Sequence, residues 1–243
     1  MAIYMWRDVP VPAWIYRSNS LWLISLSDGI SNWLTMSDKN LWATTVYNNW
    51  DTLSESNCGK YYQWWNNYGF PWTWNITTSS TTIDANNYWP WNYYSSSTFI
   101  VSWNSWWDNS WNANLRWDTT DTLEARRWPC SEWYHVPSSY ELDKLILICT
   151  TLWAWELSDT NYSVTKMPFA WYRSETDGSV SYQNSRALYW SSTPSTTDIG
   201  KWIWIVNGNQ ASFLSNWRKT GGRLIRPFKN DIVTPDSTRT KLY

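Results

Sequence analysis

Few residues of this chain have the types and the spacing that catalysis would require. The sequence of 243 residues contains one histidine, His135, and three cysteines, Cys58, Cys130 and Cys149. No two cysteines form a CxxC pair, so we expect no zinc site. A serine-histidine-aspartate set could use only His135, and the sequence has no glycine-rich phosphate loop. We therefore expect a protein that is not an enzyme and has no catalytic residues, with His135 as a structural hydrogen-bonding group.

A cluster of oxygen-bearing side chains is the candidate for a metal site. Asp108, Asn112, Asn114 and Asp118 lie within a short stretch of the chain. Calcium takes about six to eight oxygen ligands, often including several carboxylates. The same side chains are suited to Asx turns that satisfy loop backbone groups, and we favour that interpretation. We therefore expect no cofactor and no metal ligand, and calcium is kept as the alternative.

Alternating side chains near the C-terminal end predict a strand with two different faces. In the segment 201–206, Ile203 and Ile205 alternate with Trp202 and Trp204, which is the period-2 pattern of a strand. We assign the isoleucines to the core and the tryptophans to an outward face. An exposed aromatic pair surrounded by polar groups is typical of a protein-binding surface. The predicted ligand-binding residues are Ser195, Thr196, Asp198, Lys201, Trp202, Trp204, Asn207, Asn209, Gln210, Ser212 and Asn216.

Positive charge is concentrated in the same part of the chain. Residues 186–229 hold seven Lys and Arg residues against Asp198 alone, whereas the whole chain has a net charge of −1. A basic surface there favours an anionic ligand or partner. The alternative is that Arg223 and Arg226 pair with carboxylates or carbonyls inside the fold, and the sequence does not decide between the two.

Seven phrases between residues 39 and 229 carry a resemblance to a known family. They read KNLWATTVYN, NCGKYYQWWNNYGFPWTW, NANLRWD, RRWPCSEWYHVPSSYELDKL, MPFAWYRSETDGSVSYQ, YWSSTP and GGRLIRPF. The phrases and their order resemble a bacterial C-type-lectin-fold family, the paralogous domains first catalogued in Fibrobacter. The resemblance implies an α+β fold, the C-type lectin fold, with short mixed or antiparallel strands, long ordered loops and one or two helices. It places the ligand-binding domain at 38–229, after a short strand segment or attachment module at 1–37 and before a loose polar tail at 230–243.

Several ligand-binding proteins of this fold are diversified by retroelements, whose reverse transcriptase mutates adenines. Asparagine codons are frequent targets, and Asn207, Asn209 and Asn216 lie where the resemblance places such variation. Trp202 and Trp204 are less expected there, because adenine mutation of an asparagine codon cannot give a tryptophan codon. The resemblance therefore implies a receptor-recognition protein with a variable C-terminal surface that binds a cell-surface protein or glycan.

Two other functions remain open. The chain could be a structural cell-surface or phage-particle module without a variable site. The formylglycine-generating oxidases share a related fold, but they need a reactive cysteine pair near the C-terminal end, and here no cysteine follows Cys149.

The charge and the apolar content of the chain limit the kinds of partner that it can have. The net charge of −1 gives no general attraction to nucleic acid. No apolar run approaches the about 18 residues that cross a bilayer, so we expect no membrane insertion. Residues 1–10 lack the pattern of a signal peptide. A location on the cell surface or on a phage particle is favoured, the compartment is left undetermined, and an oligomer remains open.

The tryptophan content is the anomaly of the composition. The chain has 26 Trp and 8 Gly, whereas ordinary chains contain about 7% Gly. Tryptophans in turn-like contexts, where glycine is usually needed for positive φ, are Trp50, Trp89, Trp91, Trp128 and Trp133. Positions where the resembling family usually has glycine are those of Trp65, Trp128, Trp133 and Trp171.

We hypothesise that the source organism reads UGA as glycine and that this sequence was translated with UGA as tryptophan. The alternative is a genuinely tryptophan-rich binding protein. The tryptophans that suit their contexts as tryptophan are Trp33, Trp42, Trp64, Trp106 and Trp190.

A few elements must hold these surfaces in place. The segment 39–49 contains β-branched residues and predicts a strand. The segment 54–70 predicts a short helix stopped near Gly69, and 71–123 predicts long ordered loops. The clearest helix is 136–152, because Ser138 and Glu141 have the spacing of a capping box. Its apolar stripe comprises Leu142, Leu145, Ile146, Cys149 and Leu152.

Overall fold

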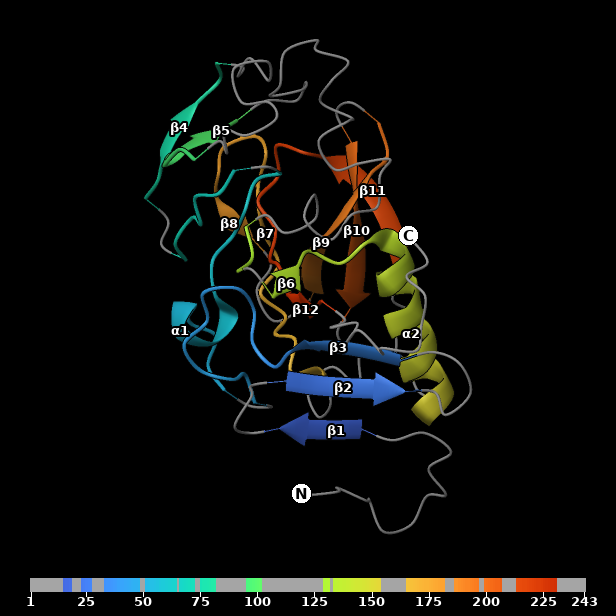
Figure 1. Ribbon diagram of the computed structural model, residues 1–243. Helices are drawn as coiled ribbons and strands as arrows, with labels where there is room; N and C mark the ends of the chain where they lie inside the picture. The colour runs from blue at the N-terminus through green and yellow to red at the C-terminus, as the bar shows by residue number, and fades with distance from the viewer. Residues whose placement is uncertain are drawn as a thin grey trace.

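The chain forms an α+β fold in which strands predominate (Figure 1). The computed structural model describes residues 15–18, 23–27, 33–48, 51–64, 66–72, 75–81, 95–101, 129–131, 133–153, 165–181, 186–196, 199–206 and 213–230. Within these segments there are two helices, α1 (Glu55–Cys58) and α2 (Ser139–Trp153). Neither is both long enough and apolar enough to span a membrane.

The largest sheet joins the beginning of the chain to its end. Its strands lie in the order β1 (Ile15–Ser18), β2 (Leu23–Ser27), β3 (Trp33–Ser37), β12 (Phe228–Lys229) and β6 (Tyr134–His135). All neighbouring strands are antiparallel. Figure 1 shows β1, β2 and β3 in blue at one end of the molecule, with β12 and β6 beside them.

The strand segment expected in residues 1–37 is thus part of a sheet that also contains β12. Phe228 pairs with Met36 on one side and with His135 on the other. Ile24 and Met36 are buried in the main core cluster. The expected boundary after residue 37 stays a prediction.

The second sheet is formed by the C-terminal part of the chain. It has three antiparallel strands in the order β11 (Phe213–Arg218), β10 (Ile199–Val206) and β9 (Arg186–Pro194). Ile203 and Ile205 on β10 are both fully buried in the main core cluster. The predicted strand and the inward direction of its isoleucines are therefore confirmed.

Helix α2 packs against β3, β9, β10 and β11. Its capping box is confirmed, because Glu141 N donates to Ser138 Oγ at 3.2 Å and Ser138 N donates to Glu141 Oε2 at 2.7 Å. Leu142 and Leu145 of the predicted stripe are buried, as is Cys149. The stripe also includes Ile148, while Ile146 is only partly buried. The side chain of Leu152 lies outside the described residues.

Two small sheets complete the described fold. β4 (Thr77–Ser79) runs parallel to β5 (Thr98–Ile100), and β7 (Tyr172–Arg173) runs antiparallel to β8 (Val180–Ser181). The first sheet lies within the segment 71–123 that was expected to be loops. Much of that segment is outside the described residues.

The segment Lys219 to Phe228 passes through the interior and is buried throughout. Its backbone forms isolated bridges from Gly222 to Arg173, from Arg223 to Tyr62 and from Leu224 to Tyr189. Leu41 N donates to Ile225 O at 2.9 Å, and Ser37 N donates to Pro227 O at 2.9 Å. This irregular segment therefore connects the two large sheets with the middle of the chain.

Two expectations for the N-terminal half are wrong. The described part of the segment expected as a strand, residues 39–48, is not one, because Trp42 has φ 66° and the amides of Thr44 and Thr45 both donate to Ser56 O. The helix expected over 54–70 ends at Cys58. Gly59, with φ 76°, terminates it, and a Cβ there would lie 2.3 Å from Leu41 O.

Candidate ligand-binding site

The two faces of the β9–β10–β11 sheet have different neighbours. Paired residues of adjacent strands share a face, so Trp190 of β9, Trp202 of β10 and Ser215 of β11 lie together opposite Ile203. We call this side the cavity face. The other side packs on the main core.

The cavity face is largely covered, which corrects one expectation. Trp202 is 4% exposed and belongs to a second buried cluster that includes Tyr62, Trp64 and Ile225. Trp204 is half-buried and stacks on Trp202 at 5.7 Å between ring centroids. The expected exposed tryptophan pair is therefore wrong for Trp202, because residues far away in the sequence cover it.

A cavity of about 180 Å³ opens on this face. Its walls are mostly aromatic, and they come from β7, β9, β10, β11 and the buried segment. The lining residues are Trp171, Tyr172, Arg186, Leu188, Trp202, Trp204, Ser215, Trp217 and Arg223. None of these described lining residues is acidic, whereas two are arginines.

Arg223 is the most buried cation of the cavity. Its guanidinium carbon lies 4.2 Å from the ring centroid of Trp190, 5.0 Å from that of Trp202 and 5.9 Å from that of Tyr172. A Cβ at Gly221 would lie 2.5 Å from Arg223 Nη1, so glycine provides the room for the guanidinium. Such ring faces attract a cation.

The hydrogen bonding of Arg223 is sparse. Within the described chain, its side chain makes one hydrogen bond, from Nη1 to Arg218 O at 3.4 Å, and its buried Nε has no partner. The Nε1 of Trp202 likewise has no partner among the described residues. Burial lowers the pKa of Arg223 to about 10, while nearby Glu175 opposes this shift.

Arg186 is the second cation of the cavity and is half-buried. Its guanidinium carbon lies 4.8 Å from the ring centroid of Trp171 and 4.6 Å from that of Trp204. Glu175 lies at the edge of the site, where its Oε1 accepts a hydrogen bond of 2.6 Å from Trp217 Nε1. Neither arginine forms an ion pair with Glu175 within the described chain.

The structure brings only part of the predicted binding set together. Trp202 and Trp204 line the cavity, whereas Lys201 and Asn216 pair with each other on the opposite face of the sheet. Ser195 and Thr196 are exposed beyond the end of β9. The predicted residues outside the described segments are Asp198, Asn207, Asn209, Gln210 and Ser212.

Sequence reasoning missed most of the cavity. Arg186 and Arg223 contributed to the basic excess of this part of the chain, and Arg186 shares the strand parity of Leu188 and Trp190. No signal in the sequence places Trp171 or Trp217 beside them.

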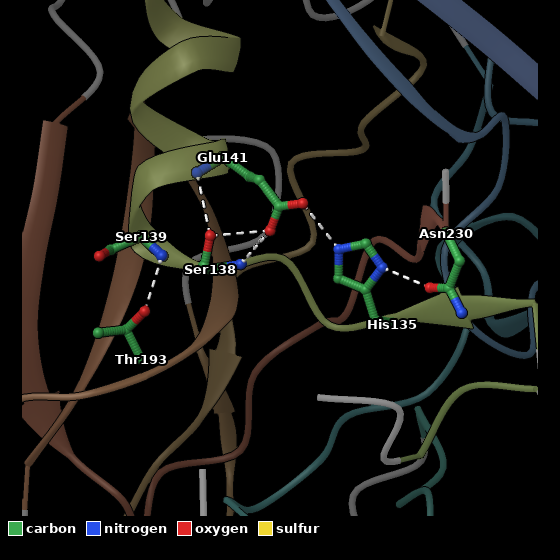
Figure 2. A network of polar contacts seen from close by, with 6 residues as sticks. All are labelled: His135, Ser138, Ser139, Glu141, Thr193 and Asn230. Carbon is green, nitrogen blue, oxygen red and sulfur yellow. Dashed lines mark hydrogen bonds and ion pairs between the residues drawn. The ribbon is translucent and has the colours of Figure 1, made fainter. Parts of the chain in front are cut away.

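His135 lies in a separate polar network (Figure 2). Hydrogen bonds join its Nδ1 to Asn230 Oδ1 at 2.7 Å and its Nε2 to Glu141 Oε1 at 2.8 Å. Glu141 Oε2 accepts from Ser138, and Ser139 N donates to Thr193 Oγ1 at 2.9 Å. Nε2 of the buried His135 thus joins β6 to α2, and Nδ1 joins β6 to the residue that follows β12. Asn230, which was assigned to a loose tail, is held in place.

The cysteines do not resemble nucleophiles. Cys58, Cys130 and Cys149 are free and buried, which confirms the assignment of Cys149 to the core. Burial raises the pKa of Cys58 to about 12 and also raises that of Cys130. A thiolate is the reactive form of cysteine, and these environments disfavour it.

Metal ligands are not evident in the described segments. No group of three or more His, Cys, Asp or Glu residues that could hold a metal ion occurs among them. The oxygen donors between Asp108 and Asp118 lie outside the described residues.

Two tryptophans have a backbone conformation that favours glycine. The described non-glycine residues with positive φ are Trp42 at 66°, Lys166 at 54° and Trp171 at 50°. Trp42 is also 65% exposed, and Lys60 Nζ lies 5.3 Å from its ring centroid, so the expectation that it suits its context as tryptophan stays a prediction. Trp64 and Trp190 are buried, which suits tryptophan.

The other tryptophans named for the recoding hypothesis divide between the described and undescribed parts of the chain. Trp133 is 58% exposed at a turn. Trp50, Trp65, Trp89, Trp91, Trp106 and Trp128 lie outside the described residues.

No family model, curated protein or solved structure was found to match the chain.

Proposed function

We propose that this chain is a ligand-binding protein, not an enzyme, and that it binds its ligand in the cavity on the β9–β10–β11 sheet. One observation carries the proposal: a cavity with aromatic walls contains the buried and sparsely hydrogen-bonded guanidinium of Arg223. Concave sites with apolar walls and a few placed polar groups are the usual form of ligand pockets.

The scaffold in this proposal is the C-type lectin fold. Short antiparallel strands, two helices in the described chain and a buried C-terminal segment support it, together with the phrases of the sequence. The ligand is part of a cell-surface protein or glycan. Variation by a retroelement would act on the connection 207–212 between β10 and β11. A structural module without a binding site is the competing function, and the presence of the cavity favours binding.

A matched pair of substitutions tests the location of the site. Ser215 lies on the cavity face and its neighbour Asn216 on the opposite one, so Ser215→Tyr should fill the cavity while Asn216→Tyr should not reach it. The full chain and both variants would be applied to an immobilised panel of neutral and acidic oligosaccharides and to intact bacterial cells. We expect binding by the parent chain and by Asn216→Tyr, and a loss of at least about tenfold in affinity for Ser215→Tyr.

Thermal melts and near-UV circular dichroism of each variant show that the fold persists. Ile203→Ala serves as the control for instability, since this buried side chain should cost about 2–5 kcal/mol of folding free energy without touching a ligand. Loss of binding in folded Asn216→Tyr, with binding retained in Ser215→Tyr, would move the site to the α2 side of the sheet. Binding of no probe at all would favour the structural module.

A further inference from the structure

Arg223 is a buried charge with unusually few hydrogen bonds to offset the cost of its removal from water. Removing a guanidinium from water is costly unless its donors are used. Here the ring faces of Trp190 and Trp202 provide attraction, but one long hydrogen bond is all that the side chain makes in the described chain. An acceptor within the cavity would use the remaining donors.

A second donor lies at the same place. Trp202 Nε1 is buried and has no hydrogen-bond partner in the described chain, and Trp202 lines the cavity together with Arg223. Two buried donors beside one cavity indicate an acceptor group on the ligand. Arg186 adds a second positive charge, and no described lining residue is acidic. The acceptor group should therefore be anionic.

Glu175 is the nearby carboxylate that could oppose such a ligand. Its Oε1 is occupied by the indole N–H of Trp217, and it does not line the cavity. No ion pair within the described chain joins it to Arg223. Glu175 acts on the charge of Arg223 through space, but within the described chain it occupies none of the hydrogen-bond donors of Arg223, which an anion could therefore use.

The size and the walls of the cavity limit the rest of the ligand. At about 180 Å³ the cavity is smaller than the usual range of about 300–1,000 Å³ for ligand pockets. It accommodates one ring or one side chain of a larger molecule. Aromatic walls offer flat apolar faces with polar edges, which suit a pyranose with its apolar C–H face and its hydroxyl rim. The short flexible stem of an acidic amino acid would leave these walls unused.

We propose that the cavity binds an acidic sugar residue, with the sugar carboxylate at Arg223 and Trp202 and the ring between the aromatic walls. This inference rests on the proposed ligand-binding function and specifies its chemistry. A guanidinium can donate two parallel hydrogen bonds to a carboxylate, which makes the carboxylate the favoured anion.

The test uses free sugars and the full chain. Glucuronic acid, galacturonic acid and N-acetylneuraminic acid would be titrated by calorimetry beside glucose and galactose as uncharged counterparts, and beside glucose 6-sulfate. We expect at least one acid to bind about tenfold or more tightly than the neutral sugars. Arg223→Met should reduce this preference to about twofold or less, and Arg186→Met should reduce it partly.

Lys229→Met is the matched control, because it removes one positive charge from β12, outside the cavity. It should leave the preference unchanged. Equal binding of acids and neutral sugars, lost in Ser215→Tyr, would overturn the anionic ligand while the proposed site stands. Equal binding of the sulfate and the best acid would overturn the carboxylate assignment. If no sugar binds, the acidic-sugar inference is overturned, and the proposed function then depends on the cell-binding result.

Discussion

Arg223 and Arg226 lie three residues apart in one buried segment, yet their surroundings are opposite. Arg226 is fully buried and donates from Nη1 to Ser37 O at 2.9 Å and from Nη2 to Lys166 O at 2.6 Å. Arg223 is 1% exposed, faces aromatic rings and makes one hydrogen bond of 3.4 Å within the described chain.

Burial alone does not distinguish these two arginines. Desolvation lowers the pKa of both, to about 10 for Arg223. The difference lies in the partners of the two guanidinium groups. Arg226 connects two stretches of backbone, whereas Arg223 lines the cavity and makes a single hydrogen bond within the described chain. The sequence left both possibilities open for the pair. Arg226 pairs with carbonyls inside the fold, whereas anion binding by Arg223 is our proposal.

The largest expected effect is a difference in folding stability between variants of the two arginines. Arg226→Met leaves the carbonyls of Ser37 and Lys166 without their charged donors, so we expect a loss of about 3–5 kcal/mol of unfolding free energy from the two hydrogen bonds. Arg223→Met replaces a poorly satisfied buried charge by an apolar side chain of similar length. We expect a change of no more than about 1 kcal/mol, because the lost attraction to the rings of Trp190 and Trp202 offsets the relieved desolvation of the charge. Urea unfolding of both variants without ligand measures the difference.

The slope of each unfolding curve is the control, because an unchanged slope shows that the unfolded states remain comparable. Equal destabilisation by the two substitutions would break the comparison. Arg223 would then be a structural residue, and the acidic-sugar inference would lose its main support.

His135, like Arg226, is a buried residue whose hydrogen bonds we expect to stabilise the fold. β6 pairs with β12 next to Arg226, and both ring nitrogens of His135 are hydrogen-bonded. His135→Gln should cost about 1–3 kcal/mol, because Glu141 or Asn230 loses a buried partner. Ligand binding per folded molecule should not change.

Tyr140→Ala is the control on the same helix, because this side chain is 64% exposed and should change stability by no more than about 0.5 kcal/mol. Urea curves and the panel assay with each variant measure both quantities. A folded His135→Gln protein that loses binding would contradict the structural role of this residue.

Local patterns were sufficient for parts of this structure. Period-2 alternation placed Ile203 and Ile205 in the core, and the spacing of Ser138 and Glu141 identified the start of α2. Both depend on residues that are neighbours in the sequence. The mixed α+β class also agrees with expectation, whereas the finer fold assignment remains a proposal.

Contacts between distant residues were beyond these patterns. The cover over Trp202 comes from Tyr62, Trp64 and Ile225, which no periodicity connects to β10. The segment 39–49 has β-branched residues, but its amides bond to Ser56 instead of a neighbouring strand. The cavity likewise depends on Trp171, which precedes β7 in the chain and forms a bridge to Ala187 of β9.

Recoding of tryptophan to glycine would have different consequences at the cavity and at the turn that contains Trp42. Trp171, with φ 50°, forms a wall of the cavity, so glycine there would widen the binding site. Trp42 follows a segment in which Ser37 O accepts a hydrogen bond from Arg226 and Leu41 N donates one to Ile225 O, so glycine at position 42 would leave the cavity intact. If UGA is read as glycine, mass spectrometry of peptides from the source organism should show glycine at the positions of Trp128, Trp133 and Trp171. Intact tryptophan at all three would refute the hypothesis.

The smallest expected effect tests the backbone at Trp42. A left-handed conformation costs a non-glycine residue about 1–2 kcal/mol, and glycine avoids this cost but loses more chain entropy on folding. Trp42→Gly and Trp42→Ala both remove the ring that lies 5.3 Å from Lys60 Nζ, so this loss cancels between them. We therefore expect the glycine variant to be more stable than the alanine variant by about 1 kcal/mol, measured by urea unfolding. Equal stability would mean that the turn at φ 66° imposes no demand for glycine. The tryptophan at position 42 would then be explained without recoding, and the backbone would no longer support glycine at this position.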